Sequence, residues 1–569
     1  MATAEEALLG LSVSDSLADE NKTVDPALKE QRKAAKQAKK AAKAAKAAQK
    51  LDRRPAGVKG ANRDGMEIKK SDDFGEWFSQ LVTKTEMIEF YDVSGCYILR
   101  PWSFAMWETI REYFDAEIKK LGVQNAYFPL FVSKKRLTTE EDHIEGFAAE
   151  VAWVTKSGKK DLEEPIAVRP TSETIMYPAY SKWIRSYRDL PLKLNQWSNV
   201  VRWEFKYPTP FIRSREFLWQ EGHTAFATKE EADVEVLQIL NLYRSVYEDL
   251  LAVPVIRGRK SDKEKFAGGL YTTTIEGFIP TNGRAIQAAT SHCLGQNFSR
   301  MFKIEYEIGD NKKQFVWQNS WGLTTRSIGV MAMVHSDDKG LVLPPRIAPI
   351  QVVVVPILRK GMEKMVRDAA EELEQELQKD GIRVKADLRD DKNPGWKFNY
   401  WELKGVPLRL ELGPRDIEGG SVMATKRVDG EKSMFERAKV CETVKTTLES
   451  IHKSTFEKAR IARDEKIVRV DKWADFVPAL DKRTMVLAPW CEQTPCEEDV
   501  KDRSGEESQQ RLGEEGEVDK KALSGSAKTL CIPFEEELSR LGVEKIGEDA
   551  KCFACAEKAT AYTLWGRSY

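Results

Sequence analysis

The sequence predicts an α+β protein of several domains, in which an antiparallel sheet flanked by helices precedes two smaller domains. Three observations support this prediction. Residues 61–345 mix strand and helix patterns without regular β-α-β alternation, which favours an antiparallel sheet. Residues 346–455 show a β-α-β pattern, which is typical of a small α/β domain. Residues 456–569 combine charged helical patterns with apolar strands, so we expect a small α+β domain there.

Length and composition predict a protein of several domains without a membrane span. A chain of 569 residues suggests roughly three to four domains. The formal net charge is zero, so any nucleic-acid site must be local. The longest apolar run, at residues 350–358, contains Gln351 and Pro356, and we expect no membrane span. Acidic residues near the start argue against a secretory or mitochondrial leader, and eight cysteines in this length fit a reducing compartment.

The first 60 residues form a basic extension of low complexity. From Lys29 to Lys50 the chain is almost entirely Ala, Lys and Gln, and lysines recur at steps of three and four residues. This spacing predicts a helix with one positively charged face and no apolar face. Two interpretations stay open, namely a solvated tail and an arm that contacts nucleic-acid phosphates.

Several elements of the large domain can be placed from their periodicity. The spacing of Trp77, Leu81, Thr85 and Ile88 predicts a helix, and residues 122–129 predict a strand that ends at a proline. Residues 200–223 predict two strands joined by a basic loop that contains prolines.

This predicted hairpin gathers charged and aromatic side chains. Alternation places Arg202 and Glu204 on one face of the first strand, and Phe217, Trp219 and Glu221 on one face of the second. If the strands pair antiparallel, this surface suits a small cationic apolar ligand beside a phosphate. The alternative is an ordinary amphipathic hairpin with surface ion pairs.

The two following domains have their own patterns. Residues 350–356 predict a buried strand, an apolar stripe from Met362 to Leu377 predicts a helix that ends at Gly381, and residues 382–388 alternate as a second strand. Residues 458–482 are charged and helical. Acidic residues, glycine and serine dominate the segment 497–528, which we expect to be a solvated loop.

Five separated motifs carry a family resemblance. In chain order they are Phe128-Pro129, Arg169-Pro-Thr-Ser-Glu-Thr174, the hairpin with Arg202-x-Glu204, Gly268-Gly-Leu-Tyr-Thr-Thr-Thr274 with Gln287-Ala-Ala-Thr-Ser-His292, and Trp321-Gly-Leu-Thr-Thr-Arg326. The chain therefore resembles prolyl-tRNA synthetases of the eukaryotic and archaeal type, which are class II aminoacyl-tRNA synthetases. The resemblance implies a catalytic domain at 61–345, an anticodon-binding domain at 346–455 and a zinc-binding C-terminal domain at 456–569.

The resemblance also implies a reaction and its partners. Proline is activated by ATP to prolyl-adenylate, and the prolyl group is transferred to the 3′ end of tRNA(Pro). Magnesium accompanies ATP, a structural zinc ion is expected, the location is cytoplasmic, and the region around Pro129 implies a homodimer. The bacterial members' editing insertion has no room between Glu221 and Arg326, so no editing in cis is expected.

The resemblance assigns roles to individual side chains. Arg202 contacts the α-phosphate and the proline carboxylate, and Arg326 contacts the γ-phosphate. The other implied ATP contacts are Glu204, Arg213, Ser214, Gln287, Thr290 and Thr324, with Gln287 also near magnesium. The implied proline contacts are Thr171, Glu173, Arg202, Phe217, Trp219, Glu221 and His292.

Elementary chemistry agrees with these roles. The proline carboxylate attacks phosphorus directly, so the step requires positioning and charge stabilisation rather than a base. Two guanidinium forks suit phosphate oxygens. Aromatic rings and Glu173 suit a small ring that carries a secondary ammonium. His292 taken alone is more often structural than functional, and its place in the motif favours a function.

The cysteines near the end suggest a metal site. Cys491 and Cys496 form one pair, and Cys552 and Cys555 form another. Four thiolates suit a closed tetrahedral zinc site. The alternative is a set of free buried thiols, and Cys531 competes with Cys555 as the fourth ligand.

Two further points stay open from the sequence, and one more feature fits the resemblance. Arg409, Glu411, Arg415 and Lys426 are either anticodon contacts or salt bridges. A regulator without chemistry, or a synthetase for threonine or glycine, competes with the proline enzyme. The tail at residues 563–569 matches the family's ending, where it folds back on the catalytic domain.

Overall fold

The computed structural model describes residues 65–141, 151–205, 207–309, 312–514 and 525–569. The predicted basic extension at 1–60 lies outside the described residues. The described residues after Asp64 belong to one compact unit.

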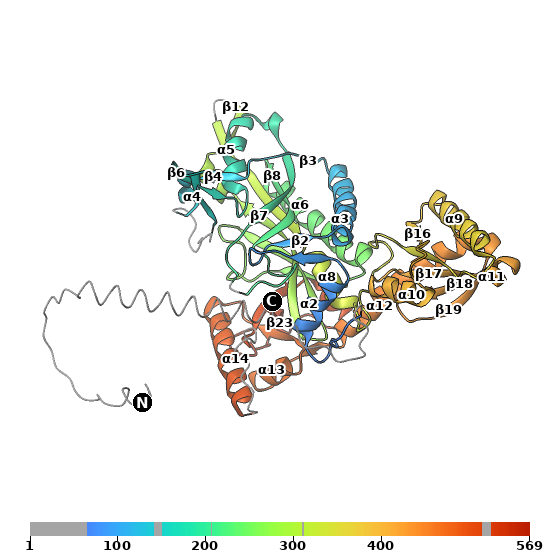
Figure 1. Cartoon of the computed structure of the whole chain (residues 1–569). Helices are drawn as coiled ribbons and strands as arrows, with labels where there is room; N and C mark the ends of the chain where they lie inside the picture. The colour runs from blue at the N-terminus through green and yellow to red at the C-terminus, as the bar shows by residue number, and fades with distance from the viewer. Residues whose placement is uncertain (1–64, 142–150, 206, 310–311, 515–524) are drawn as a thin grey trace, which may run out of the picture. The chain divides into compact units, whose positions relative to one another are not determined.

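A large mixed sheet, mainly antiparallel, organises the part of the chain that the structure describes (Figure 1). Its eleven strands lie in the order β20 (Ile467–Arg469), β21 (Met485–Trp490), β23 (Ala561–Ser568), β22 (Lys528–Pro533), β9 (Ile256–Arg259), β10 (Tyr271–Ile279), β11 (Arg284–Gly295), β14 (Trp317–Thr324), β8 (Glu216–Phe226), β7 (Leu192–Val201) and β3 (Gln124–Asn125). All neighbours from β21 to β7 pair antiparallel, whereas β3 and β20 pair parallel at the two edges. The expected antiparallel sheet is thus confirmed, and it extends into the C-terminal residues.

Helices and short hairpins accompany this sheet. The helices are α2 (Phe74–Lys84), α3 (Pro101–Lys120), α4 (Lys134–Glu141), α5 (Glu173–Trp183), α6 (Lys229–Ser245), α7 (Asn297–Phe302) and α8 (Arg326–His335), with the 3₁₀ helix η1 (Tyr187–Asp189) and the π-helix η2 (Val246–Leu250). The smaller sheets are β1 (Ile88–Phe90) with β2 (Tyr97–Leu99), β4 (Phe131–Ser133) with β6 (Lys160–Val168) and β5 (Trp153–Ser157), and β12 (Glu305–Gly309) with β13 (Lys312–Phe315).

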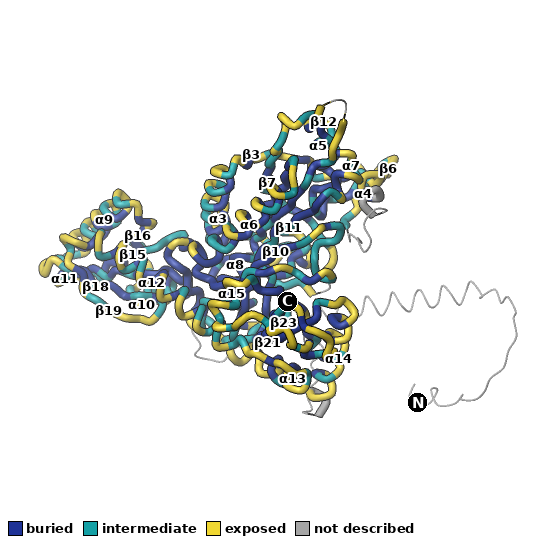
Figure 2. Tube along the Cα trace, turned by 180° about the vertical axis from the view of Figure 1, so that it is seen from behind, coloured by how far each residue is buried: buried dark blue, intermediate teal, exposed yellow. Residues whose placement is uncertain are grey.

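Local sequence explains where key helices begin. Asp73 caps α2 by accepting from the Glu76 amide, and Thr228 and Glu231 form a capping box at the start of α6. One face of each helix is buried in the core that also contains Tyr243 and Trp321. Buried residues accordingly run along α8, β10 and β11 in Figure 2. This core holds the middle strands of the sheet in place.

The α/β domain contains a sheet of five strands. Their order is β16 (Val384–Ala386), β15 (Val352–Pro356), β17 (Leu408–Leu412), β18 (Ser421–Lys426) and β19 (Lys432–Glu436), with α9 (Glu363–Lys379), α10 (Pro394–Leu403), α11 (Pro414–Glu418) and η3 (Arg437–Lys439). Strand β15 is buried throughout, as its apolar run predicts. Helix α12 (Val440–Asp464) continues across residue 455, so the chain has no break at the expected boundary.

The expected acidic loop at 497–528 is wrong for most of its length. Residues Thr494–Glu514 form helix α14, residues 515–524 lie outside the described residues, and β22 begins at Lys528. Val500, Ser504 and Ser508 are buried at four-residue steps, and the Ala527 amide donates to Ser504 Oγ over 2.8 Å. Because two of these residues are serines, the packed face has no apolar stripe that the sequence could reveal.

The C-terminal elements complete the fold. Helices α13 (Trp473–Asp481) and α15 (Glu535–Arg540) accompany β21, β22 and β23. In the described part of the chain, no helix is both long and apolar enough to cross a bilayer. Strand β23 also pairs parallel with the start of β11, where Arg284 is opposite Arg567. The C-terminal strands are therefore part of the same sheet as the central strands.

Candidate active site

A cavity of about 310 Å³ lies over the central strands of the large sheet. Its walls come from the β7–β8 hairpin, from β11 and β14, and from the starts of α5 and α8. The sequence-predicted residues that line it are Thr171, Glu173, Arg202, Glu204, Ser214, Phe217, Trp219, Glu221, Gln287, Thr290, His292, Thr324 and Arg326. The structure thus brings together side chains that are far apart in the sequence. The first and the last of them, Thr171 and Arg326, are 155 positions apart.

The hairpin pairs antiparallel, as predicted, but its first strand is shorter than expected. Strand β7 ends at Val201, which is opposite Glu216, so Arg202 and Glu204 follow the strand rather than lie in it. The Arg202 amide still donates to the Arg215 carbonyl over 2.8 Å, and a turn begins after that bond. The turn, and not strand alternation, therefore directs Arg202 and Glu204 to the cavity.

The second strand confirms the predicted alternation. Trp219 and Glu221 both reach the cavity from β8, with Gly222 next to Glu221. A Cβ atom at Gly222 would lie 2.2 Å from the indole of Trp321. Only glycine fits there, because the Trp321 ring packs directly on the backbone.

The guanidinium of Arg202 is held on one side only. Its Nε donates to the Pro170 carbonyl over 2.9 Å, and its Cζ lies 5.8 Å from the ring of Phe217 and 5.3 Å from that of Trp219. Among the described residues, its two Nη groups have no hydrogen-bond acceptor. They are available to an anion in the cavity.

Arg326 opens helix α8, and its guanidinium is fixed by backbone carbonyls. Nε and Nη2 donate to Ile212 O over 3.2 and 3.1 Å, and Nη1 donates to Gln287 O over 3.2 Å. Burial lowers the pKa of Arg326, and the charges of Arg202 and Arg213 lower it further. An arginine stays protonated in proteins, so two cations share the cavity, and among the described residues neither forms an ion pair with a carboxylate.

A bulge in β11 decides which of its side chains reach the cavity. Residues Gln287 and Thr290 are an odd number of positions apart, so regular alternation would place them on opposite faces. The register shifts so that Ile275 faces Ala289 and Glu276 faces Gln287, which leaves Ala288 as the extra residue. Because of this bulge, Gln287 joins Thr290 and His292 in the cavity wall.

The carboxylates of the cavity are held by hydroxyl and imidazole groups. Thr171 donates to Glu173 through a short hydrogen bond. Ser172 Oγ donates to Glu221 Oε1 over 2.5 Å, and His223 Nε2 lies 3.1 Å from Glu221 Oε2. Burial alone would lower the pKa of His223, but the hydrogen bond with Glu221 and the charges of Glu173 and Glu221 raise it. The Glu221 carboxylate therefore favours the protonated form of His223.

His292 is the second histidine of the cavity, and its pKa is shifted in the opposite direction. Its Nδ1 lies 2.8 Å from Thr272 Oγ1, and its Nε2 lies 3.0 Å from Thr290 Oγ1. Burial, and next the charge of His223, lower the pKa of His292 to about 3. A neutral imidazole with hydroxyl partners can hold a fixed orientation in the cavity wall.

Arg213 is the predicted residue that does not line this cavity. Its guanidinium lies 5.8 Å from the ring of Phe205, and its pKa is lowered by burial despite the opposing effect of Tyr569. The side chain stays within electrostatic reach of Arg326. Its expected direct contact with the nucleotide is therefore not evident in the geometry.

Sequence reasoning missed several residues of the cavity. Glu264, Phe266 and Thr272 line it beside or within the glycine-rich motif at 268–274, and that proximity was the available signal. Gln196 supports Glu221 from behind by donating over 3.0 Å. The two residues are direct cross-strand partners, so the hairpin register would have identified Gln196.

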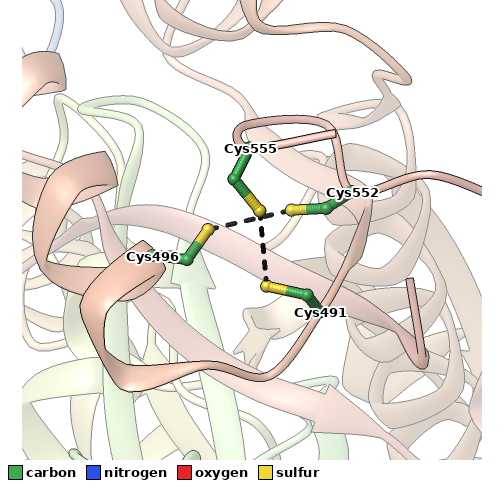
Figure 3. Close-up of side chains that lie close together, drawn as sticks. All are labelled: Cys491, Cys496, Cys552 and Cys555. Carbon is green, nitrogen blue, oxygen red and sulfur yellow. Dashed lines mark hydrogen bonds between the residues drawn. The ribbon is translucent and has the colours of Figure 1, made fainter. Parts of the chain in front are cut away.

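The predicted cysteines come together in the C-terminal residues (Figure 3). The sulfurs of Cys491, Cys496, Cys552 and Cys555 all lie within 4.8 Å of one another, with Cys491 and Cys555 3.6 Å apart and Cys496 and Cys552 3.8 Å apart. A hydrogen bond from Cys496 lowers the pKa of Cys552 to about 4. This four-thiol cluster could hold a zinc ion. Cys531 is buried outside it, so the structure groups Cys555, and not Cys531, with the other three thiols.

Comparisons with known proteins agree with this arrangement. A family model described as "Prolyl-tRNA synthetase, C-terminal" matches residues 473–569. The "tRNA synthetase class II core domain (G, H, P, S and T)" matches 153–335, and "Anticodon binding domain" matches 351–447. "Proline--tRNA ligase, cytoplasmic" of Arabidopsis thaliana is 56% identical over 506 residues, which cover 89% of this chain and 91% of that protein. The chain belongs to the prolyl-tRNA synthetase family.

Two other relatives illustrate the breadth of this family. "Proline--tRNA ligase" of Encephalitozoon cuniculi is 48% identical and covers 89% of this chain and 99% of that protein. "Bifunctional glutamate/proline--tRNA ligase" of Drosophila melanogaster is 55% identical over 90% of this chain but only 30% of its own length. The prolyl-tRNA synthetase unit thus occurs alone and within a larger protein.

The anticodon-binding domain of this prolyl-tRNA synthetase contains the expected charged residues. Arg409 Nη2 donates to Glu411 Oε1 over 2.8 Å, and Lys426 Nζ pairs with Glu431 over 2.5 Å. Arg409, Glu411 and Lys426 thus take part in salt bridges, and Arg415 lies in α11. The tail docks as the family resemblance implies, because Asn282 Nδ2 donates to Tyr569 Oη over 2.6 Å beside β11.

Proposed function

We propose that this chain is a proline–tRNA ligase that activates proline with ATP and transfers the prolyl group to the 3′ end of tRNA(Pro). The observation that carries this proposal is the shared cavity of Arg202 and Arg326, bounded by Trp219 and Glu173. Two cations suit a triphosphate, and the adjacent rings and carboxylate suit an imino acid. Family membership supports the same assignment.

The chemistry follows from this charge arrangement. The proline carboxylate attacks the α-phosphorus of ATP, the bond to the bridging oxygen breaks, and pyrophosphate leaves with the electron pair. Arg202 binds the α-phosphate and the proline carboxylate, and its free Nη groups support this role. Arg326, fixed by the carbonyls of Ile212 and Gln287, binds the γ-phosphate. Fixed guanidiniums stabilise the developing charge without reorganisation.

The rest of the nucleotide site is assigned as the motifs imply. Glu204, exposed at the rim of the cavity, accepts from the adenine amino group. Ser214, Gln287, Thr290 and Thr324 contact ribose and phosphates, and Arg213 acts through its charge near Arg326. Gln287 would help to hold a magnesium ion, which would supply further charge neutralisation.

The proline site occupies the other end of the cavity. Glu173, with Thr171 beside it, pairs with the secondary ammonium, and Phe217 and Trp219 form the apolar wall. Trp219 Nε1 is buried and has no partner among the described residues, so it is free to donate to the substrate carboxylate. Glu221 and His292 complete the site and fix its shape.

Partners and location are part of the same proposal. The anticodon-binding domain recognises tRNA(Pro), the four-thiol cluster holds a structural zinc ion, and the location is cytoplasmic, as named for the Arabidopsis relative. We further propose a homodimer. Exposed aromatic rings at Tyr127 and Phe131, beside Pro129, support it, since exposed apolar surface of this kind favours association.

The deciding experiment is ATP–pyrophosphate exchange by the purified full chain. We expect exchange that requires proline and that threonine or glycine does not support. Exchange with either of those amino acids would identify a different class II synthetase. No exchange with any amino acid, together with retained tRNA binding, would identify a regulator without chemistry.

A further inference from the structure

One wall of the cavity is a turn rather than a strand. Residues 260–270 connect β9 to β10, and Glu264 and Phe266 from this turn line the cavity. The ring of Phe266 lies 4.9 Å from that of His292, and the Phe266 amide donates to Thr272 Oγ1 over 2.9 Å. The later part of the turn is thus held from within the catalytic domain, against the residues assigned to proline.

The beginning of the same turn is held by the C-terminal domain. Ser261 is 3% exposed. It accepts from the Glu264 amide over 3.2 Å and donates to Glu497 Oε1 over 3.0 Å. Thr529, on β22, donates to the same carboxylate oxygen. The buried carboxylate of Glu497 therefore fixes Ser261, near the start of the turn.

Two further contacts reinforce this anchor. Lys263 Nζ lies 3.0 Å from Glu498 Oε1, and Lys260 Nζ donates to the Leu530 carbonyl over 2.6 Å. Residues 260, 261 and 263 are thus all held by α14 and β22. Hydrogen bonds to a carboxylate in a dry environment are stronger than those between neutral groups.

Glu497 also connects this anchor to the four-thiol cluster. It directly follows Cys496, in the first turn of α14, and both side chains are buried. A displacement of Cys496 must move Glu497, because the two residues share a peptide bond. The cysteines, the carboxylate, Ser261 and the cavity wall form one continuous chain of contacts.

We propose that Glu497 is a positioning residue that holds the turn 261–266 as the wall of the proline site and couples that site to the four-thiol cluster. This inference rests on the proposed function. Glu497 touches no substrate and acts through Ser261 and Glu264. The assignment makes the C-terminal domain a determinant of proline affinity in addition to its contribution to the shared sheet.

The test compares Glu497→Gln with Asp499→Asn in full-length protein. Both changes remove one negative charge from the first turns of α14, but Asp499 pairs only with Arg503 among the described residues. We expect Glu497→Gln to raise the KM for proline about tenfold in ATP–pyrophosphate exchange, with the KM for ATP changed less than twofold. Asp499→Asn is expected to leave both values unchanged.

Hydrogen exchange and a second variant distinguish a local effect on the turn from a general loss of structure. In hydrogen exchange without substrates, the amides of residues 261–266 should lose protection in Glu497→Gln, while those of β10 and β11 keep it. Ser261→Ala, which removes the donor and leaves α14 intact, should reproduce the loss. The double variant should be no worse than the more impaired single variant, since both changes act on the same contact between residues 261 and 497.

The cysteine cluster is tested in the same way. Metal-depleted wild-type protein should lose protection at residues 261–266, and zinc should restore it in the wild type but not in Glu497→Gln. An unchanged proline KM in Glu497→Gln, together with full amide protection of the turn, would overturn the proposal. An equal rise in the KM values for proline and for ATP would also overturn it. A wild type without proline-dependent exchange would instead overturn the proposed function.

Discussion

The imidazole of His223 lies 3.1 Å from the carboxylate of Glu221, and both side chains are buried beside the cavity. The contact favours the charged imidazole, because the pKa of His223 is raised by Glu221 and Glu173 even though burial opposes this. In the proposed proline site, Glu221 is then engaged by His223, and Glu173 is the carboxylate assigned to the ammonium of proline. Replacement of His223 therefore tests both stability and substrate binding.

His223→Gln is expected to show a pH-dependent loss of stability. The folded pKa lies above the unfolded value of about 6.5, so the contribution of His223 is complete below that pH and is lost as pH rises through the folded pKa. Urea unfolding of wild type and variant between pH 5.5 and 9 measures the difference. His335→Gln is the contrast, because burial lowers the pKa of His335 to about 3. There the contribution is complete above pH 6.5 and decreases toward acid.

Arg202→Lys and Arg326→Lys should each slow proline-dependent exchange by roughly 10²–10³-fold. A lysine keeps the charge but loses the planar fork that binds two phosphate oxygens. Arg469, which pairs with Asp471 away from the cavity, supplies the control Arg469→Lys, for which we expect wild-type rates. Near-normal exchange in either cavity variant would remove that arginine from the triphosphate site.

Glu173→Ala should weaken proline binding by about 2–4 kcal/mol, or roughly 30- to 800-fold in KM, because the ammonium loses its counter-charge. ATP binding should change little. Glu216→Ala, an exposed carboxylate at the start of β8, is the matched control in the same hairpin. The measurement is a proline titration at saturating ATP, and an unchanged KM would exclude Glu173 from the site.

Native protein should contain one zinc ion per chain. Cys491→Ser and Cys555→Ser should lose it, because each removes one of four thiolates. Cys531→Ser should keep its zinc, since Cys531 lies outside the cluster. Metal analysis of the purified variants decides the point, and full zinc content in Cys555→Ser would contradict the assignment.

Mischarged Ala-tRNA should not be hydrolysed in cis. The described residues between Glu221 and Arg326 form strands and helices of the central sheet and its cover, which supports the expectation from chain length. Deacylation by the pure protein should match the spontaneous rate. Rapid deacylation, abolished by heat inactivation, would show that an editing site exists.

Much of the site was accessible from the sequence because strand alternation is a simple rule. Phe217, Trp219 and Glu221 follow it on β8. Gln287 does not, since the bulge at Ala288 resets the alternation, and bulges depend on tertiary packing rather than on local composition. The protonation of His223 also needed the structure, because it depends on a carboxylate two residues away and on another from helix α5.

Helix α14 and the contacts of Glu497 could not be predicted from the sequence, because both depend on tertiary packing. The buried face of α14 contains Ser504 and Ser508, so its periodicity is not hydrophobic. The contacts of Glu497 connect residues more than 230 positions apart, and no local pattern predicts such a pair. Element types inside the α/β domain were clearer, as β15 is continuously apolar and α9 has a strong stripe.

The pairing of β9 with β22 has a consequence for biosynthesis. Arg259 is opposite Ile532. One edge of β9 therefore stays unpaired until the ribosome has synthesised β22, about 270 residues later. At typical elongation rates this interval lasts on the order of tens of seconds. An unpaired strand edge is prone to aggregation. We therefore expect the nascent chain to bind chaperones before its last strands are synthesised.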